Sequence, residues 1–206
     1  MAGNDELGRF AAPDLTPTGL AARGWDRASL RAYLATGTAP PAVASDEMLK
    51  VVNLSTSRLD GKDLDAIATY LTGDSPRPAA ALARPAGAAA PSPAQDRYFA
   101  FCAGCHGRDG RDGQGVPHVA PALHGNSSLR DANPHNLIVA ILDGLPEHDF
   151  PGLERMQDMP GFGEQLDDAQ VAELANWLRS RYGRTEPVSA ERVRALRSAT
   201  SESGHR

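Results

Sequence analysis

Both cysteines of the sequence lie in one short motif, Cys102-Ala103-Gly104-Cys105-His106. A disulfide across so short a loop would add little stability, because the stabilisation by a cross-link grows with the length of the closed loop. Cys-x-x-Cys-His is instead the attachment signature of c-type haem. Two thiols at this spacing can reach both vinyl groups of one porphyrin, and the histidine can face its iron. The motif therefore predicts one covalently bound haem c, with Cys102 and Cys105 as its anchors and His106 as an axial ligand.

Two other uses of the cysteine pair have less support. A thioredoxin-like dithiol belongs beside a βαβ unit, and alternating apolar and polar residues are scarce in this chain. A zinc site needs four ligands, which His118 and His124 would complete, but that spacing fits no common zinc pattern. We expect His118, His124, His135 and His148 to be surface or loop residues rather than ligands.

A methionine downstream is the expected second axial ligand, because the His/Met pair is typical of c cytochromes and raises the reduction potential. Met159 begins Met-Pro-Gly-Phe-Gly, whose proline and glycines would fix a rigid loop, whereas Met156 has no such setting. A weak thioether bond is lost easily if its loop moves, so Met159 is preferred and Met156 is expected to fill core space. Pro121 is a candidate to accept a hydrogen bond from the ligand histidine, although a simple turn explains this proline nearly as well. Leu123 is expected to lie against the porphyrin.

Two axial ligands would leave the iron no open position for a substrate. The chain is therefore predicted to transfer electrons and to have no catalytic residues. The alternatives are a haem enzyme or gas sensor with five-coordinate iron, and an interaction module held together by zinc.

Two segments, 1–72 and 94–183, flank a stretch rich in proline and alanine at 73–93, which is typical of an extended linker. The segments repeat one another at a constant offset of 107 residues. The matched pairs include Leu30 with Leu137, Gly37 with Gly144, Leu64 with Val171, and Tyr70-Leu71 with Trp177-Leu178. Apolar residues recur at helical spacing in each matched piece, so the predicted fold class is all-α.

Capping signals mark three helix starts in the second segment, at Ser92-Pro93, Asn133-Pro134, and Asp167 with Gln170. The first of these helices runs into Cys102 and should pack against the last. The expected core aromatics are Tyr98, Phe99, Phe101, Phe162 and Trp177. A polar tail at 184–206 is expected to hold one short helix, over 189–197, and then disorder.

The first segment contains no cysteine, and the counterpart of the haem-attachment helix would fall before residue 1. Met48, between the matched helices, is interpreted either as a vestigial axial ligand or as a core residue of a domain that never bound haem. Helices suited to cover a porphyrin would leave apolar surface exposed without it. We therefore expect the chain to be a fragment or a truncated product.

The net charge of −5 and the isoelectric point near 5.7 argue against a nucleic-acid partner, because no basic surface is available to neutralise phosphates. No apolar run approaches the roughly 20 residues that span a bilayer. The residues 1–10 also lack the basic and apolar regions of a signal peptide.

Motifs along nearly the whole chain resemble the cytochrome c subunit of membrane-bound alcohol and sugar-acid dehydrogenases, which joins three class I cytochrome c domains. In the first segment the resemblance rests on Ala12-Pro13-Asp14-Leu15-Thr16, Gly24-Trp25, Tyr33-Leu34-Ala35-Thr36-Gly37 and Met48-Leu49-Lys50-Val51-Val52 with Ser55-Thr56. In the second it rests on the cysteine motif with Gly107, Asn136-Leu137-Ile138, Met159-Pro160-Gly161-Phe162-Gly163, 171–179 and 188–197. Thr56-Ser57 departs from the Thr-Gln of the family.

The resemblance implies that residues 94–183 are a class I cytochrome c domain with one haem. Residues 1–72 would be a partial, haemless cytochrome c-like segment. It also implies a relay in the respiratory chain, with the catalytic subunit of a quinoprotein or flavoprotein dehydrogenase as electron donor and a quinone or another cytochrome as acceptor. The expected location is the periplasm, at the outer face of the inner membrane.

Overall fold

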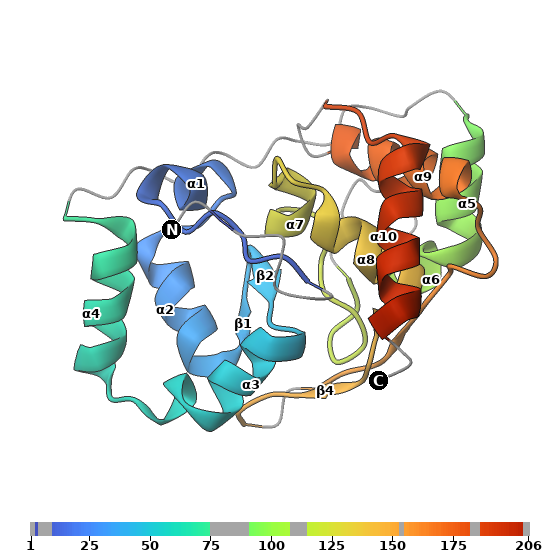
Figure 1. Ribbon diagram of the computed structural model, residues 1–206. Helices are drawn as coiled ribbons and strands as arrows, with labels where there is room; N and C mark the ends of the chain where they lie inside the picture. Colours follow the sequence, from blue (N-terminus) through green and yellow to red (C-terminus); the bar gives the residue numbers. More distant parts are fainter. Residues whose placement is uncertain are drawn as a thin grey trace.

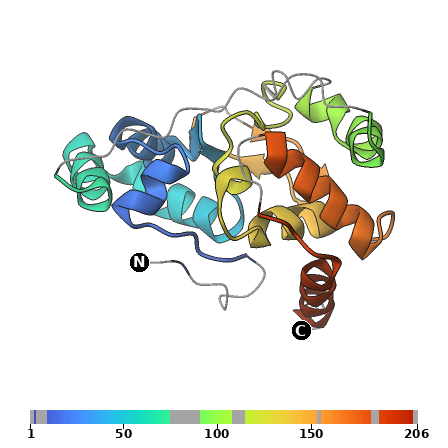
Figure 2. The ribbon, with the colours of Figure 1, turned by 90° about the horizontal axis from the view of Figure 1, so that it is seen from above.

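The structure is a computed structural model that describes residue 3 and residues 10–74, 91–107, 115–152, 155–181 and 186–203. Within these ranges helices form most of the ordered elements, and the strands are short pairs of two residues each. The prediction of an all-α protein is therefore confirmed. The two segments lie side by side, with α1 to α4 in one lobe and α5 to α10 in the other (Figures 1 and 2).

The first lobe, residues 10–74, is built from helices packed around two apolar clusters. Its elements are α1 (Pro17–Ala22), α2 (Arg27–Thr36), β1 (Thr38–Ala39), β2 (Ala42–Val43), α3 (Asp46–Leu54), a 3-10 turn (Thr56–Arg58) and α4 (Gly61–Thr72). The side chain of Asp26 caps α2 and accepts a hydrogen bond from the Ser29 amide at 2.7 Å. The core of this lobe is centred on the contact between α2 and α4.

The second lobe, residues 91–203, has one larger core to which every long helix contributes. Its helices are α5 (Pro93–Phe101), α6 (Ala103–His106), α7 (Ser127–Arg130), α8 (His135–Asp143), α9 (Asp168–Arg181) and α10 (Ala190–Ser203). Two antiparallel strand pairs lie between α8 and α9: β3 (Gly144–Leu145) with β6 (Met159–Pro160), and β4 (His148–Asp149) with β5 (Arg155–Met156).

The capping signals place the helix starts correctly at two of three positions. The Ser92 hydroxyl accepts a hydrogen bond from the Gln95 amide at 3.2 Å, and Asp167 and Gln170 bond to each other's backbone amides at 2.8 and 3.0 Å. At the third position, Pro134 is the N-cap of α8 and not its first helical residue. The Asn133 side chain accepts a hydrogen bond from the backbone amide of residue 135, so the helix begins one residue later than expected.

The internal repeat is confirmed in three dimensions. Helices α2 and α4 of the first lobe occupy the sequence positions of α8 and α9 at the offset of 107, and each pair packs together. Gly37 and Gly144 end the first helix of each pair with φ of 78° and 71°, a left-handed conformation that strains other residues. The sequence match therefore reflects one supersecondary unit built twice.

The second lobe extends beyond the expected boundary, because α10 is packed and longer than predicted. Val188, Val193 and Leu196 are buried in the main core. Arg197 donates to the Leu166 carbonyl at 2.9 Å and pairs with Asp168 at 2.8 Å. The helix expected over 189–197 is therefore present, but the expectation of disorder after it was wrong for residues 198–203, because α10 continues to Ser203 and packs on α8 and α9.

Some burial predictions were also wrong. His135 and His148 are 5% and 8% exposed, so they are buried rather than surface residues. Phe99 and Phe101 are 42% and 39% exposed, because the buried face of α5 is the one that carries Tyr98. The expected packing of α5 on α9 is confirmed, with the Tyr98 ring 4.9 Å from that of Trp177.

Most of the predicted linker, residues 75–90, lies outside the described residues. On either side of this stretch, α4 ends at Thr72 and α5 begins at Pro93. Among the described residues no helix has the length and apolar character needed to cross a bilayer.

Specific hydrogen bonds join the two lobes. The Asn136 side chain makes two bonds with the backbone of Ala11, at 2.8 and 2.9 Å. The Ser127 amide donates to the Pro41 carbonyl at 2.6 Å. The lobes therefore share an interface in which polar backbone groups of one lobe are satisfied by the other.

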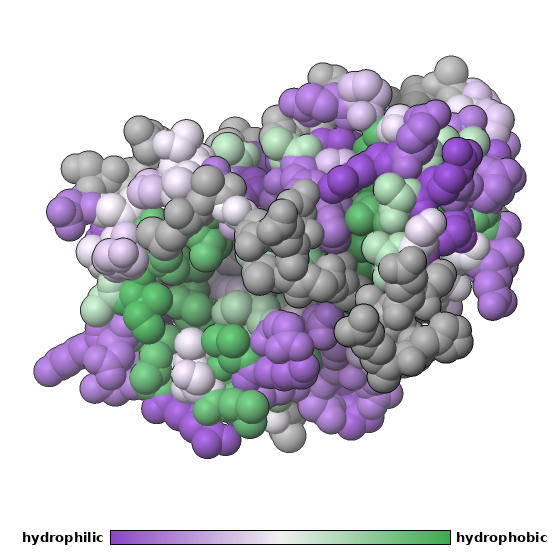
Figure 3. All heavy atoms as spheres, in the orientation of Figure 1, coloured by the Kyte–Doolittle hydropathy of each residue, from purple (hydrophilic) through white to green (hydrophobic). Residues whose placement is uncertain are grey.

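One face of the first lobe remains apolar and exposed, as expected for its helices. Figure 3 shows apolar side chains gathered over α2 and α3. On α3, Val51 and Leu54 are 44% and 68% exposed, and Tyr70 on α4 is 73% exposed.

Arg179 in α9 is expected to be a major determinant of stability. Its side chain is 1% exposed and donates to the carbonyls of Glu186, Asp131 and Ala132 at 3.0, 3.0 and 3.3 Å. Arg179→Met would leave these acceptors without partners and should lower the free energy of unfolding by roughly 3 kcal/mol. Urea denaturation measures this loss. The matched variant Arg97→Met breaks a surface pair with Glu173 and should cost less than about 1 kcal/mol.

The buried His148 predicts a loss of stability in acid. Burial lowers the pKa of His148 below its ordinary value of 6.5, against the opposing effects of a hydrogen bond with Glu147 and the charge of Asp46. The unfolded chain then binds a proton that the folded protein does not accept until lower pH. Above about pH 6.5 this difference in proton binding does not affect stability. As the pH falls from there towards the folded pKa, it destabilises the folded protein increasingly. Urea midpoints should therefore drop less between about pH 7.5 and pH 5.5 in His148→Gln than in the wild type, and equal drops would contradict the assignment.

Candidate haem site

The cysteine motif lies at the junction of two helices. Cys102 follows the last residue of α5, and α6 carries Cys105 and His106. The backbone turns continuously, since the amides of Cys102 and His106 donate to Tyr98 and Cys102 carbonyls at 2.9 Å each. Gly107 then ends α6 with φ of 95°. The two cysteines are not joined by a disulfide and lie on one short turn, as attachment to a single porphyrin requires.

His106 is oriented by one hydrogen bond. Its Nδ1 lies 3.0 Å from the Pro121 carbonyl oxygen, and the residue is 8% exposed. A carbonyl only accepts, so Nδ1 carries the proton and Nε2 keeps its lone pair for a metal. Burial also lowers the pKa of His106, which favours the neutral form that a metal binds. The structure thus brings His106 together with Pro121, which the sequence had offered as a candidate for this bond.

The two thiols differ in environment. Cys102 is partly buried, and burial raises the pKa of its thiol to about 12, whereas Cys105 is exposed. The two cysteines of the motif therefore differ in their exposure to solvent. Among the described residues, no three His, Cys, Asp or Glu side chains lie close enough together to hold a metal ion.

Met159 lies on a loop fixed by the end of α8. Its strand β6 pairs with β3, with Met159 opposite Leu145. The amides of Phe162 and Gly163 donate to carbonyls of α8 at 2.9 Å each. Gly144 permits this contact, because a Cβ there would lie 2.2 Å from the Met159 carbonyl oxygen. The predicted rigidity of the loop is therefore present in its hydrogen bonds and backbone packing.

The methionines fall into different parts of the structure. Met159 packs against the main core of the second lobe, together with Cys102 and Leu123. Met156 packs instead with Met48 in the small cluster around Ala44 and Val52 of the first lobe. Met159, unlike Met156, thus packs against the same core as Cys102.

Two features of the site were not predicted from the sequence. The Tyr98 hydroxyl donates to the Gly107 carbonyl at 2.7 Å and braces the end of α6. Gly144 lies against the Met159 backbone, as described above. The match between Gly144 and Gly37 in the internal repeat indicated a helix end. It did not indicate which segment of the chain would pack against Gly144.

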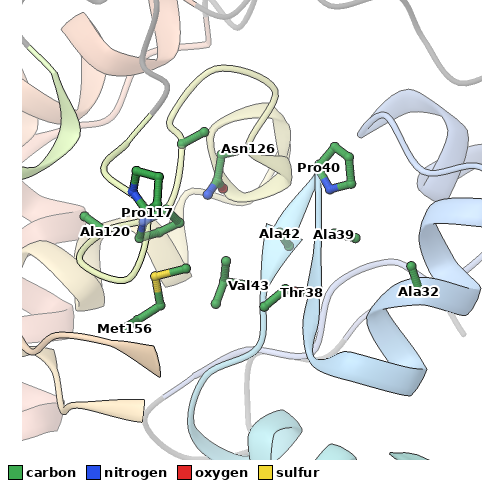
Figure 4. Close-up of a pocket in the computed structure, with 12 residues that line it drawn as sticks. Ala32, Thr38, Ala39, Pro40, Ala42, Val43, Pro117, Ala120, Asn126 and Met156 are labelled. Carbon is green, nitrogen blue, oxygen red and sulfur yellow. The ribbon is translucent and has the colours of Figure 1, made fainter. Parts of the chain in front are cut away.

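A pocket of about 450 Å³ opens between the lobes beside the Pro121 loop (Figure 4). Small apolar side chains of the β1–β2 hairpin form one wall, and Pro117, Ala120, Pro121, Ala122 and Asn126 form the other. Met156 closes the lower side in this view. The loop that orients His106 therefore lines a pocket that it shares with the first lobe.

The helical core, the Cys-x-x-Cys-His turn and the methionine-bearing loop define a class of protein. The cytochrome c family matches residues 93–181, so this part of the chain is a cytochrome c domain. Proteins of this class transfer electrons through a covalently bound haem c, and the donor set of the motif fits that group.

Comparison with curated relatives shows a more specific resemblance. The chain is 33% identical over 188 residues to a subunit of the nicotinate dehydrogenase of Pseudomonas putida, covering 87% of this chain and 15% of the relative. It is 29% identical over 212 residues to the cytochrome c subunit of a quinone alcohol dehydrogenase of Gluconacetobacter polyoxogenes, covering 96% and 44%. To the fructose dehydrogenase cytochrome subunit of Gluconobacter japonicus it is 28% identical over 231 residues, covering 96% and 45%. The resemblance to dehydrogenase cytochrome subunits is confirmed, and the chain spans less than half the length of these relatives.

Proposed function

We propose that the second lobe binds one haem c through thioether bonds from Cys102 and Cys105, with His106 and Met159 as the axial ligands. The observation that carries this proposal is the hydrogen bond from His106 Nδ1 to Pro121, which aims the free ring nitrogen away from the loop. The bound haem would supply a one-electron couple. The protein's own part is to fix the ligands and to surround the group with apolar side chains such as Leu123 and Phe162.

Met159 is preferred over Met156 as the sixth ligand for a physical reason. A thioether binds iron weakly, so its loop must be held in place before binding. The Met159 loop is held by paired strands and by amide bonds to α8, and its side chain belongs to the core that includes Cys102. Met156 belongs to the opposite lobe's cluster.

We propose that Met48 does not ligate a haem in this chain. It packs against the two apolar clusters of the first lobe, neither of which includes a cysteine of the motif. Its packing supports the role of core residue, and the repeat supports an ancestral ligand role.

The proposed role in the cell is an electron relay at the periplasmic face of the inner membrane. A dehydrogenase catalytic subunit would donate electrons, and a quinone or another cytochrome would accept them. The likeness to cytochrome subunits of alcohol and fructose dehydrogenases supports this role.

Maturation of the chain with c-haem machinery tests the proposal. We expect one haem per chain that resists extraction by acidic organic solvent. It should be reduced by ascorbate or dithionite and reoxidised by a soluble quinone such as a short-chain ubiquinone. Haem that is extracted freely, or more than one haem per chain, would contradict the assignment.

A further inference from the structure

The segment between α8 and α9 forms a two-stranded arm, residues 144–160 without 153–154. At its base β3 pairs with β6, which carries Met159. Further out β4 pairs with β5, with His148 opposite Met156. Figure 1 shows the arm leaving the second lobe and running beneath it to α3 of the first lobe.

Phe150 lies at the outer part of this arm and inserts into the first lobe. It is 5% exposed and forms a core cluster with Ala44 and Val52, which are fully buried. The ring lies directly on Gly37, where a Cβ would approach it to 2.6 Å. A bare glycine and two small aliphatic residues thus form a socket for one aromatic side chain of the cytochrome domain.

Polar contacts hold the arm on both sides of Phe150. The Asn53 side chain of α3 donates to the Asp149 carbonyl at 3.1 Å. Arg155 bridges Glu147 and Asp149 across the strands at 3.0 and 2.7 Å. On the returning strand, the Gln157 amide donates to the Val119 carbonyl at 3.1 Å, two residues before Pro121.

We propose that the first lobe holds the arm through Phe150 and thereby fixes the loop that presents Met159, so that Phe150 is a positioning residue for the sixth ligand. The inference rests on the proposed His106/Met159 ligation. It gives the haemless lobe a function, which is to stabilise the ligand set of the neighbouring domain.

The physical reason is the weakness of the bond between sulfur and iron. The base of the arm is held by α8, but its outer part is anchored mainly in the first lobe. Truncation of Phe150 would leave a cavity in the socket and release the arm, because a buried aromatic makes many contacts that alanine cannot replace. The Met159 loop would then open more often, and an added ligand would compete for the iron more successfully.

Imidazole binding to the oxidised, haem-loaded full chain tests the inference. Phe150→Ala should raise the affinity for imidazole about tenfold and weaken the sulfur-to-iron absorption band. Phe150→Leu, which refills most of the socket, should bind imidazole nearly as the wild type does. The control is Leu64→Ala, which truncates a buried core residue of the first lobe outside the socket.

Each outcome decides a different point. An unchanged imidazole affinity in Phe150→Ala would overturn the inference, and so would an equal rise in Leu64→Ala, since general destabilisation would then explain both. If the wild type has no sulfur-to-iron band, the proposed ligation itself fails. Should Phe150→Ala not fold, Phe150→Val is expected to show a smaller shift in the same direction, and its absence would also overturn the inference.

Discussion

Replacing Met159 with alanine is expected to remove the sulfur-to-iron band of the oxidised protein and to lower the reduction potential by on the order of 0.1–0.2 V. A thioether ligand favours the reduced iron, and an alanine leaves the position to water or to a stronger nitrogen donor. Optical spectroscopy and a redox titration measure both effects. The fold should persist, since Met159 is only partly buried and its loop is held by backbone bonds.

Met156→Ala is the matched control for this variant. Met156 lies three residues away in the same arm but packs against the first lobe. Its loss should leave the band in place and change the potential little. If the band instead survives in Met159→Ala and disappears in Met156→Ala, the argument from the rigidity of the loop is wrong.

Removal of both thiols, by Cys102→Ser with Cys105→Ser, is expected to abolish covalent attachment. The yield of haem that stays with the denatured chain should fall by at least about a hundredfold, because no carbon–sulfur bond can form. His106→Ala should retain both cysteines yet lose the normal spectrum of the reduced protein. Haem staining of denaturing gels and visible spectra distinguish the two defects.

His118→Ala provides a control that separates haem from zinc. His118 is exposed, and it would be a ligand only in the zinc alternative. The haem assignment predicts a normal yield and spectrum for this variant. A protein that loses bound zinc and its fold after His118→Ala, with no haem in the wild type, would support the zinc alternative.

Local signals in the sequence predicted several features that the structure has around the candidate site. The cysteine motif, the Pro121 carbonyl and the Met159 loop depend on neighbouring residues and on glycines and prolines with specific backbone roles. The internal repeat also predicted that α2 and α4 would match α8 and α9, because equal apolar spacing imposes equal packing.

Contacts between distant segments were not predictable in the same way. Nothing near Phe150 in the sequence indicates that it inserts into the first lobe, and Gly37 gave no sign of the ring that covers it. A helix was expected over 189–197, but the burial of α10 against the main core was not, because its few apolar residues are diluted by charge. The burial of His148 depends on an arm whose path only the tertiary structure shows.

Carbon monoxide binding to the reduced, haem-loaded chain tests the central claim most directly. Six-coordinate iron with His106 and Met159 predicts a Soret band that carbon monoxide changes only weakly and slowly. Rapid and complete conversion to a carbon monoxide spectrum at low gas concentration would show an open iron position. That result would contradict the electron carrier proposed here and favour a five-coordinate haem enzyme or gas sensor.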